Sequence, residues 1–124
     1  MMISGWNSRY NEILKEFNYN KREDADSAEL LDSILGEENH IKKIQDLIKN
    51  QNVFVVGAGP SLSNAIPVLL DFKKSIKIVA DSAVKPLIDN GIKPDIVVTD
   101  LDGDETTFRK IGKSKTIFVV HAHG

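Results

Sequence analysis

Residues 52–61 read NVFVVGAGPS, a short run of β-branched and aromatic residues that passes directly into glycine. Similar apolar runs that end in polar residues occur three more times, as IKIVAD over 76–81, PDIVVTD over 94–100 and KTIFVVHAH over 115–123. These runs predict four β-strands, and their nearly continuous apolar character is typical of strands covered on both faces. The segments between them are long enough for crossover helices. We therefore expect an α/β, Rossmann-like three-layer domain with a mostly parallel sheet over 51–124.

The residues before the sheet predict a helical region over 1–50. Apolar residues recur there at helical spacing, first at Trp6, Tyr10, Ile13, Leu14 and Phe17, and again from Leu30 to Ile48. The polar stretch NYNKRED over 18–24 separates the two sets, and Gly36 divides the second into two helices or one broken helix. The apolar stripe of such helices must cover another surface.

Two prolines bear on where the helices between the strands begin. A proline is tolerated in the first turn, where its missing N–H has no partner to lose. We therefore expect the first crossover helix to be capped by Asn64, which puts Pro67 in its first turn. Pro86 has the same interpretation in the second, with the helix ending at Asn90 and Gly91 as its left-handed stop.

Composition excludes several classes of protein. A chain of 124 residues can bury one core, and its net charge of −2 comes from interspersed signs with no basic run, so nucleic acid is a poor partner. The absence of cysteine removes disulfides and thiolate metal sites, which fits a reducing compartment. No apolar run has the length of a signal peptide core or a membrane span, so we expect a cytoplasmic protein away from the membrane.

Polar residues and glycine follow each predicted strand. In chain order they are Gly57-Ala58-Gly59-Pro60-Ser61, then Asp81 and Ser82, then Asp100, Asp102 and Asp104, then His121 and His123. Ligands of open parallel sheets bind beyond the carboxyl ends of the strands. We therefore expect these residues to meet at one edge of the sheet.

The loop from Gly57 to Ser61 fits the approach of a phosphate, because glycine lets backbone N–H groups come close and Ser61 adds a hydroxyl. A tight strand-to-helix turn that needs glycine for its dihedral angles is the structural alternative. The dinucleotide fingerprint is incomplete, since Leu62 occupies its third glycine position. No Gly-Lys-Ser/Thr follows, which excludes a Walker loop.

Asp100 and Asp102 are two residues apart at a strand end, so an extended backbone would point both carboxylates to one side. Such a pair suits Mg²⁺ that bridges substrate phosphates. A solvated acidic turn that caps the next helix, over 106–110, is the alternative. An EF-hand is excluded, because Glu105 and Ile111 occupy its glycine and bidentate glutamate positions.

The remaining candidates keep several interpretations open. Asp81 could bind a ribose hydroxyl, join the metal site or cap a helix, with Ser82 beside it in the nucleotide site. His121 and His123 could contact phosphate or metal, or simply be exposed. Asp95, at the start of its strand, is assigned to structure.

The strings VVGAGPSL, ADSAVKPLIDNGIKPDIVVTDLDG and VVHAHG resemble the archaeal 6-hydroxymethyl-7,8-dihydropterin diphosphokinases, whose aspartate motifs resemble those of thiamine pyrophosphokinases. The resemblance spans essentially the whole chain. It implies Mg²⁺-dependent transfer of diphosphate from ATP to a reduced pterin, with release of AMP, in tetrahydromethanopterin or folate-like cofactor synthesis.

The same resemblance implies residue roles. Asp100 and Asp102 match metal-binding, catalytic aspartates, Asp81 the acidic residue after the second strand, and 57–61 the nucleotide loop. The general base is not identified, and His123 and an aspartate are the candidates. The family pattern continues beyond the histidine motif, which suggests a shortened chain with an incomplete acceptor pocket. The expected partner is a small pterin-like acceptor, and homo-oligomerisation is left open.

Two rival functions remain. A glycosyltransferase that uses a nucleotide-sugar has similar GAGPSL loops, and preference for a CMP-linked sugar over ATP would select it. A nucleotide-binding module without chemistry is the other, in which Asp81 grips ribose and DLDGD over 100–104 is only a cap. Metal-independent binding of NAD would select that module.

Overall fold

The structure, a computed structural model, describes residues 3–36 and 40–122. It divides into two compact units, residues 1–36 with 122–124 and residues 37–121. The first unit holds α1 (Trp6–Phe17) and α2 (Lys21–Leu35). The elements of the second are α3 (His40–Ile48), β1 (Val53–Val56), α4 (Leu62–Asp71), β2 (Ile76–Ala80), α5 (Asp81–Asp89), β3 (Ile96–Thr99), α6 (Glu105–Gly112) and β4 (Ile117–Val120). The domain boundary expected after residue 50 stays a prediction.

α1 forms where the apolar periodicity predicts it, but α2 begins at Lys21, within the polar stretch over 18–24 that was expected to be a break. Asn18, in the left-handed conformation, ends α1, and the side chain of Asn20 caps α2 by accepting a hydrogen bond from the N–H of Arg22 (2.9 Å). Gly36 adopts a positive φ at the end of α2. Neither helix has a buried residue, and Phe17 of the apolar stripe is 60% exposed. The apolar side chains of these two helices therefore lie at the surface of their unit and do not form a core.

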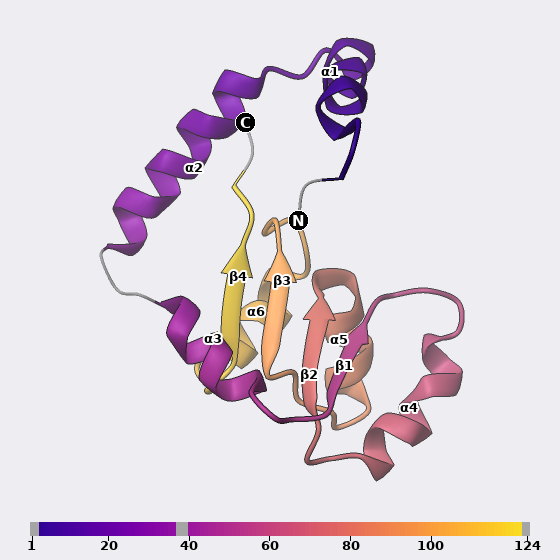
Figure 1. Cartoon of the computed structure of the whole chain (residues 1–124). Helices are drawn as coiled ribbons and strands as arrows, with labels where there is room; N and C mark the ends of the chain where they lie inside the picture. The colour runs from indigo at the N-terminus through magenta and orange to yellow at the C-terminus, as the bar shows by residue number, and fades with distance from the viewer. Residues whose placement is uncertain (1–2, 37–39, 123–124) are drawn as a thin grey trace. The chain divides into compact units, whose positions relative to one another are not determined.

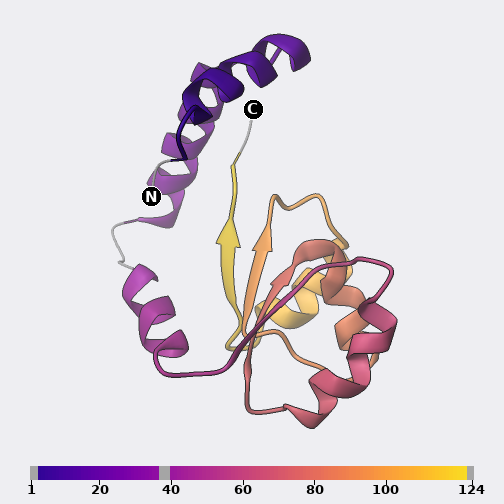
Figure 2. The same ribbon diagram turned by 45° about the vertical axis from the view of Figure 1, so that its right-hand side comes forward.

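The predicted α/β fold is confirmed, with four parallel strands in the order β1-β2-β3-β4. Figures 1 and 2 show α4, α5 and α6 on one face of this sheet and α3 on the other. Each connection between neighbouring strands passes behind the sheet in the view of Figure 1 and leads one strand to the left, which is the right-handed sense. The strands therefore all end at one edge.

The core lies between the sheet and the helices on its far face. Val79 and Val97 of the central strands and Val84 and Leu87 of α5 are fully buried there. Leu69 of α4 adds to this cluster. Burying such side chains stabilises the fold by about 1.5–3 kcal/mol each. This packing fixes the central strands whose carboxyl ends carry the candidate site.

The starts expected for two helices are wrong. α4 begins at Leu62, not after Asn64, and α5 begins at Asp81, so Pro67 and Pro86 both lie inside helices. α5 begins directly at the end of β2, and α4 begins after the loop over 57–61. In both, the early start lets the buried face of the helix pack on the sheet, at the cost of one backbone bond at the proline. The expected stop at Gly91 is confirmed by its φ of 73°.

Asp95 has the structural role expected of it. Its carboxylate accepts a hydrogen bond from the backbone N–H of Lys77 (2.9 Å). Lys77 itself is only 3% exposed, and its ammonium donates to the carbonyl oxygens of Phe72, Lys73 and Ser75. These hydrogen bonds offset the cost of burying the ammonium. Lys77 is therefore stable as a buried residue near the amino ends of the strands, at the edge of the sheet opposite the candidate site.

The search for membrane-spanning segments is negative within the described ranges 3–36 and 40–122. None of the helices there combines the length and the apolar character needed to span a bilayer.

Candidate functional site

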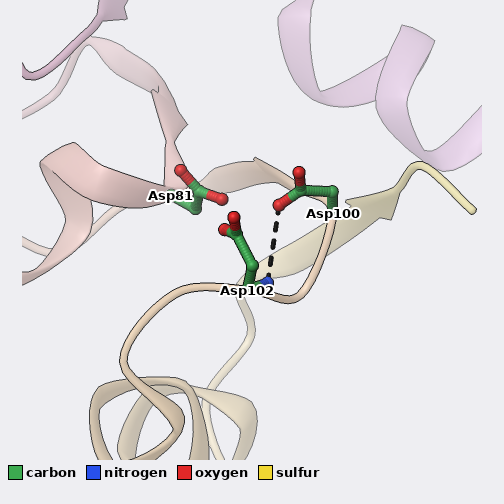
Figure 3. A group of neighbouring side chains, drawn as sticks. All are labelled: Asp81, Asp100 and Asp102. Atoms are coloured by element: carbon green, nitrogen blue, oxygen red, sulfur yellow. Dashed lines mark hydrogen bonds between the residues drawn. The ribbon is translucent and has the colours of Figure 1, made fainter. Parts of the chain in front are cut away.

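Three carboxylates from two neighbouring strand ends lie together. Asp81 is the first residue of α5, directly after β2, and Asp100 and Asp102 follow β3. One carboxylate oxygen of each lies within 4.8 Å of those of the other two. Figure 3 shows the side chains pointing toward one another from the helix and the loop. The edge of the sheet that the sequence predicts for the ligand therefore holds an acidic cluster.

Asp100 and Asp102 were expected to point to the same side because the backbone would be extended there, and that reason is wrong. The strand ends at Thr99, and Leu101 has a left-handed φ of 70°, so Asp100 and Asp102 are not alternate residues of an extended strand. They belong to a tight turn in which the N–H of Asp102 donates to the Asp100 carboxylate (3.4 Å; Figure 3). A left-handed non-glycine residue costs of order 1–3 kcal/mol and is typical of functional sites.

Thr99 supports the cluster and was missed from the sequence. Its side chain is buried, and its hydroxyl accepts a hydrogen bond from the N–H of Leu101 (2.8 Å) and donates one to Asp81 (3.3 Å). It thus ties the turn after β3 to the first residue of α5. The signal was a hydroxyl at the end of the apolar run IVVT, since a polar side chain in a buried strand needs partners.

Gly103 belongs to the segment that was expected to follow the third strand, but no role was predicted for it. A Cβ atom at this position would lie 2.7 Å from the ring carbon Cζ of Phe108 and 3.6 Å from Cβ of Asp81. The loop can therefore pass close to α6 and α5 only because residue 103 has no side chain.

The cluster has an unfavourable charge balance in the absence of a cation. A side-chain hydrogen bond with Asp102 lowers the pKa of Asp100 below its ordinary value. The same hydrogen bond, together with the negative charges of Asp100 and Asp81, raises the pKa of Asp102. Like charges crowded in this way favour a proton or a metal ion between them.

The position of Asp104 distinguishes a metal-binding role for Asp100 and Asp102 from a helix-capping role. It is the N-cap residue of α6, which begins at Glu105 rather than at the expected Thr106. The hydroxyl of Thr107 donates to its carboxylate, and this hydrogen bond lowers the pKa of Asp104. Because Asp104 lies at the helix start, Asp100 and Asp102 are not the residues that cap α6.

The loop after β1 is exposed throughout, from Gly57 to Ser61. Neither Gly57 nor Gly59 has a positive φ, and a Cβ atom at either would meet nothing within 4 Å. A tight turn does form here, with the N–H of Leu62 donating to the carbonyl of Gly59 (3.0 Å), but neither glycine has a left-handed φ that the turn would require. Ser61 is the N-cap residue of α4, and its side chain makes no capping hydrogen bond. The N–H groups of Leu62 and Asn64 already donate to the carbonyls of Gly59 and Ser61, so the attraction for an anion here comes from the exposed loop and the positive end of the α4 dipole.

The other predicted residues have less to do with the cluster. Ser82 lies beside it, and its hydroxyl donates to the Asp81 carboxylate (3.2 Å). His121 is exposed and its backbone N–H donates to the carbonyl of Thr99 (2.9 Å), but its side chain is not part of the acidic group. His123 lies outside the described residues.

A cavity of about 460 Å³ lies at the amino ends of the strands, lined in part by Lys77, Ile92 and Asp95. It is at the edge opposite the acidic cluster, so its size does not make it the ligand site.

A protein-family model described as "6-hydroxymethylpterin diphosphokinase MptE-like" matches residues 27–124. The chain belongs to this MptE-like family. The matched residues include the glycine loop, all three aspartates of the cluster and Thr99. The family match therefore includes the part of the chain that forms the acidic cluster. The resemblance inferred from the sequence is confirmed.

Curated relatives of the MptE-like chain carry one common name, 6-hydroxymethyl-7,8-dihydropterin pyrophosphokinase. The protein of Methanocaldococcus jannaschii is 39% identical over 130 residues, covering 100% of this chain and 54% of the relative. That of Pyrococcus furiosus is 45% identical over 121 residues, covering 96% and 52%. That of Methanothermobacter thermautotrophicus is 32% identical over 125 residues, covering 100% and 54%. The chain thus spans about half the length of these relatives.

Proposed function

We propose that this MptE-like chain holds the metal and nucleotide part of an enzyme that transfers diphosphate from ATP to 6-hydroxymethyl-7,8-dihydropterin. The observation that carries the proposal is the convergence of Asp81, Asp100 and Asp102 at the ligand edge of the sheet. The relatives' common name supplies the acceptor and the kind of transfer.

The donor set fits Mg²⁺. Mg²⁺ prefers carboxylate and water oxygens, and it is usually held by one or two protein carboxylates together with substrate phosphates. Three carboxylate oxygens within 4.8 Å of one another can supply these ligands after small side-chain movements. Asp100 and Asp102 are the residues assigned as direct ligands, and Asp81 either joins them or orients a bound water.

The nucleotide would lie on the glycine loop. β1 and β2 are neighbours, so the loop from Gly57 to Ser61 begins at the same edge of the sheet as Asp81. Backbone N–H groups of this loop and the start of α4 favour negative charge. In the proposed complex the phosphates would lie between the positive backbone dipoles and a cation held by the carboxylates.

The proposed reaction is a displacement at the β-phosphorus of ATP. The hydroxymethyl oxygen of the pterin attacks this phosphorus and loses its proton, the bond from the β-phosphorus to the oxygen that bridges it to the α-phosphate breaks, and AMP leaves. Bound Mg²⁺ supplies charge neutralisation on the phosphates. The chain's own residues hold the reacting groups in line, which is the main protein contribution in phosphoryl transfer.

Calorimetric titration of Mg²⁺, with and without ATP, tests the metal site on the 124-residue chain itself. Asp102→Asn removes one charge from the cluster and should weaken Mg²⁺ binding about tenfold or more. Asp104→Asn is the matched control, because it removes a charge two residues away but keeps a side chain able to cap α6. An equal loss of Mg²⁺ affinity in both variants would mean that the acidic residues act only through their overall negative charge. That result would count against Asp102 as a direct metal ligand.

Release of AMP tests the reaction. The assay uses the chain alone and the chain fused to the residues of the Methanocaldococcus relative that it does not span, with the pterin and thiamine as acceptors. We expect pterin-dependent AMP release from the fusion that is lost in Asp100→Asn. Metal-independent NAD binding, or preference for a CMP-linked sugar, would instead support one of the rival functions.

A further inference from the structure

The sheet face opposite the core is apolar on every strand. Side chains alternate along a strand, so the residues between the core positions point to this reverse face. Those positions hold only valine, isoleucine and alanine on all four strands. An apolar sheet face of this kind is normally covered by other parts of the protein.

Within residues 40–121, the reverse face is buried at the amino ends of β2 and β3, where Ile76 is 8% exposed, whereas Val53 at the amino end of β1 is 39% exposed. Ile96 at the amino end of β3 is 2% exposed, and Figures 1 and 2 show α3 on that side of the sheet. Nearer the carboxyl ends, Val55 is 81% exposed, Val98 43% and Val119 37%. Parallel sheets occur almost only with both faces covered, and a contiguous exposed apolar patch marks an interaction surface.

Chain topology restricts what can cover this face. All three connections run in the same direction, from β1 toward β4, and with right-handed crossovers this puts α4, α5 and α6 on the core face. A further strand added beyond β4 would place its helix on the same face again. Among right-handed connections between neighbouring strands, only those that run the opposite way, adding strands beside β1, lay helices across the reverse face.

The edge needed for such strands is open. In the part of the chain that the structure describes, β1 pairs with β2 alone and is the edge strand beside which no further strand lies. Its backbone groups on the outer side are a ready template for another strand. Val55, the most exposed residue of the reverse face, is on this strand.

We propose that the reverse face and the outer edge of β1 are the docking surface for the half of the longer relatives' fold that this chain does not span. The relatives extend to nearly twice the length that this chain matches. In this arrangement their additional residues cross the reverse face as amphipathic helices and pair strands beside β1. The apolar surface and the open edge are then covered by one structural unit.

One consequence concerns the glycine loop, and this consequence alone rests on the proposed function. With strands on both sides of β1, the connections reverse direction there, and ligands of α/β sheets bind at such reversal points. The loop from Gly57 to Ser61 leaves β1 at this point. The docked half would therefore form a wall of the nucleotide site.

The absence of cysteine allows a direct test by thiol labelling. Val55→Cys and Val98→Cys place single thiols on the reverse face, and Val68→Cys places one on α4, where valine is 47% exposed. Each variant is labelled with a chromogenic thiol reagent in the chain alone and in the fusion to the residues of the Methanocaldococcus relative that this chain does not span. Those residues are also supplied as a separate polypeptide, and circular dichroism verifies folding of every variant.

We expect fast labelling at all three positions in the chain alone. In the fusion, labelling at residues 55 and 98 should slow at least tenfold, with residue 68 unchanged. Undiminished labelling at 55 and 98 in both the fusion and the mixture would overturn the proposal. Protection in the chain alone that grows with protein concentration would assign the face to a second copy and also overturn it. Protection in the chain alone that does not change with concentration would assign the face to the chain's own α1 and α2, and would overturn the proposal as well. Labelling involves neither ATP nor metal, so failure of the proposed function leaves the result readable.

Discussion

Thr99 is the residue on which the geometry of the acidic cluster depends, although it carries no charge. Its hydroxyl connects the N–H of Leu101 to the carboxylate of Asp81. Thr99→Val keeps the shape but removes both hydrogen bonds, so we expect a loss of about 1 kcal/mol in the free energy of unfolding. Mg²⁺ affinity should fall about tenfold, because a supporting partner of the ligands is gone.

Calorimetry and urea denaturation measure the two effects of the Thr99 substitution. Thr99→Ser keeps the hydroxyl and should restore most of the Mg²⁺ affinity even if stability stays lower. If the serine and valine variants bind Mg²⁺ equally weakly, the hydroxyl does not position the cluster.

Gly103 gives the second prediction at this scale. A methyl group there would press on the Phe108 ring, which already packs edge-to-face on Phe118 at a centroid distance of 6.0 Å. We therefore expect Gly103→Ala to lower the free energy of unfolding by about 1–3 kcal/mol through overpacking. Since the displaced loop carries Asp102, Mg²⁺ binding should weaken as well.

Gly112→Ala is the control for Gly103→Ala. Gly112 is the last residue of α6, and a Cβ atom there would meet nothing within 4 Å. Alanine is the better helix former, so stability should stay or rise. Equal urea midpoints for the two variants would refute the packing argument.

Among the elements, the loop between β1 and α4 is the one whose glycines the fold itself does not require. Gly57→Ala and Gly59→Ala should leave the urea midpoint almost unchanged, because neither position has a positive φ or a close neighbour. ATP affinity should fall several-fold if phosphates approach this backbone. Calorimetric titration of ATP measures it.

Gly91→Ala provides the contrast to the loop substitutions. Gly91 has a φ of 73°, so alanine there should cost about 1–2 kcal/mol of stability. It lies at the end of α5, away from the loop, and ATP binding by the folded protein should not change. The loop would be purely structural if its glycine variants lost stability and kept their ATP affinity.

At the scale of the whole molecule, the two units differ in how much of them is buried. α1 and α2 have no buried residue, whereas β2, β3 and α5 carry the fully buried side chains Val79, Val97 and Leu87. Amide hydrogen exchange should therefore be at least about two orders of magnitude slower in β2, β3 and α5 than in α1 and α2. Mass spectrometry of peptic fragments measures this. Similar protection in both units would mean that they open as one cooperative unit.

Much of the fold was predictable because it depends on local patterns. The four apolar runs predicted all four strands, and the intervals between them predicted parallel pairing, since a crossover helix needs such a length. Helix starts were less predictable. The positions of Pro67 and Pro86 suggested later starts than the structure has, because the packing of the buried helix faces outweighs the lost backbone bonds.

The sequence by itself determined that polar strand ends would share one edge, because parallel strands must all end on the same side. It also determined the family, through motifs that survive at 32–45% identity to the relatives. Only the tertiary structure decided that Asp81 joins Asp100 and Asp102, that Leu101 turns them together, and that Thr99 holds the turn. The link to Asp81 depends on contacts between residues 18 or more apart, and the turn depends on the left-handed backbone of Leu101, neither of which a local periodicity encodes.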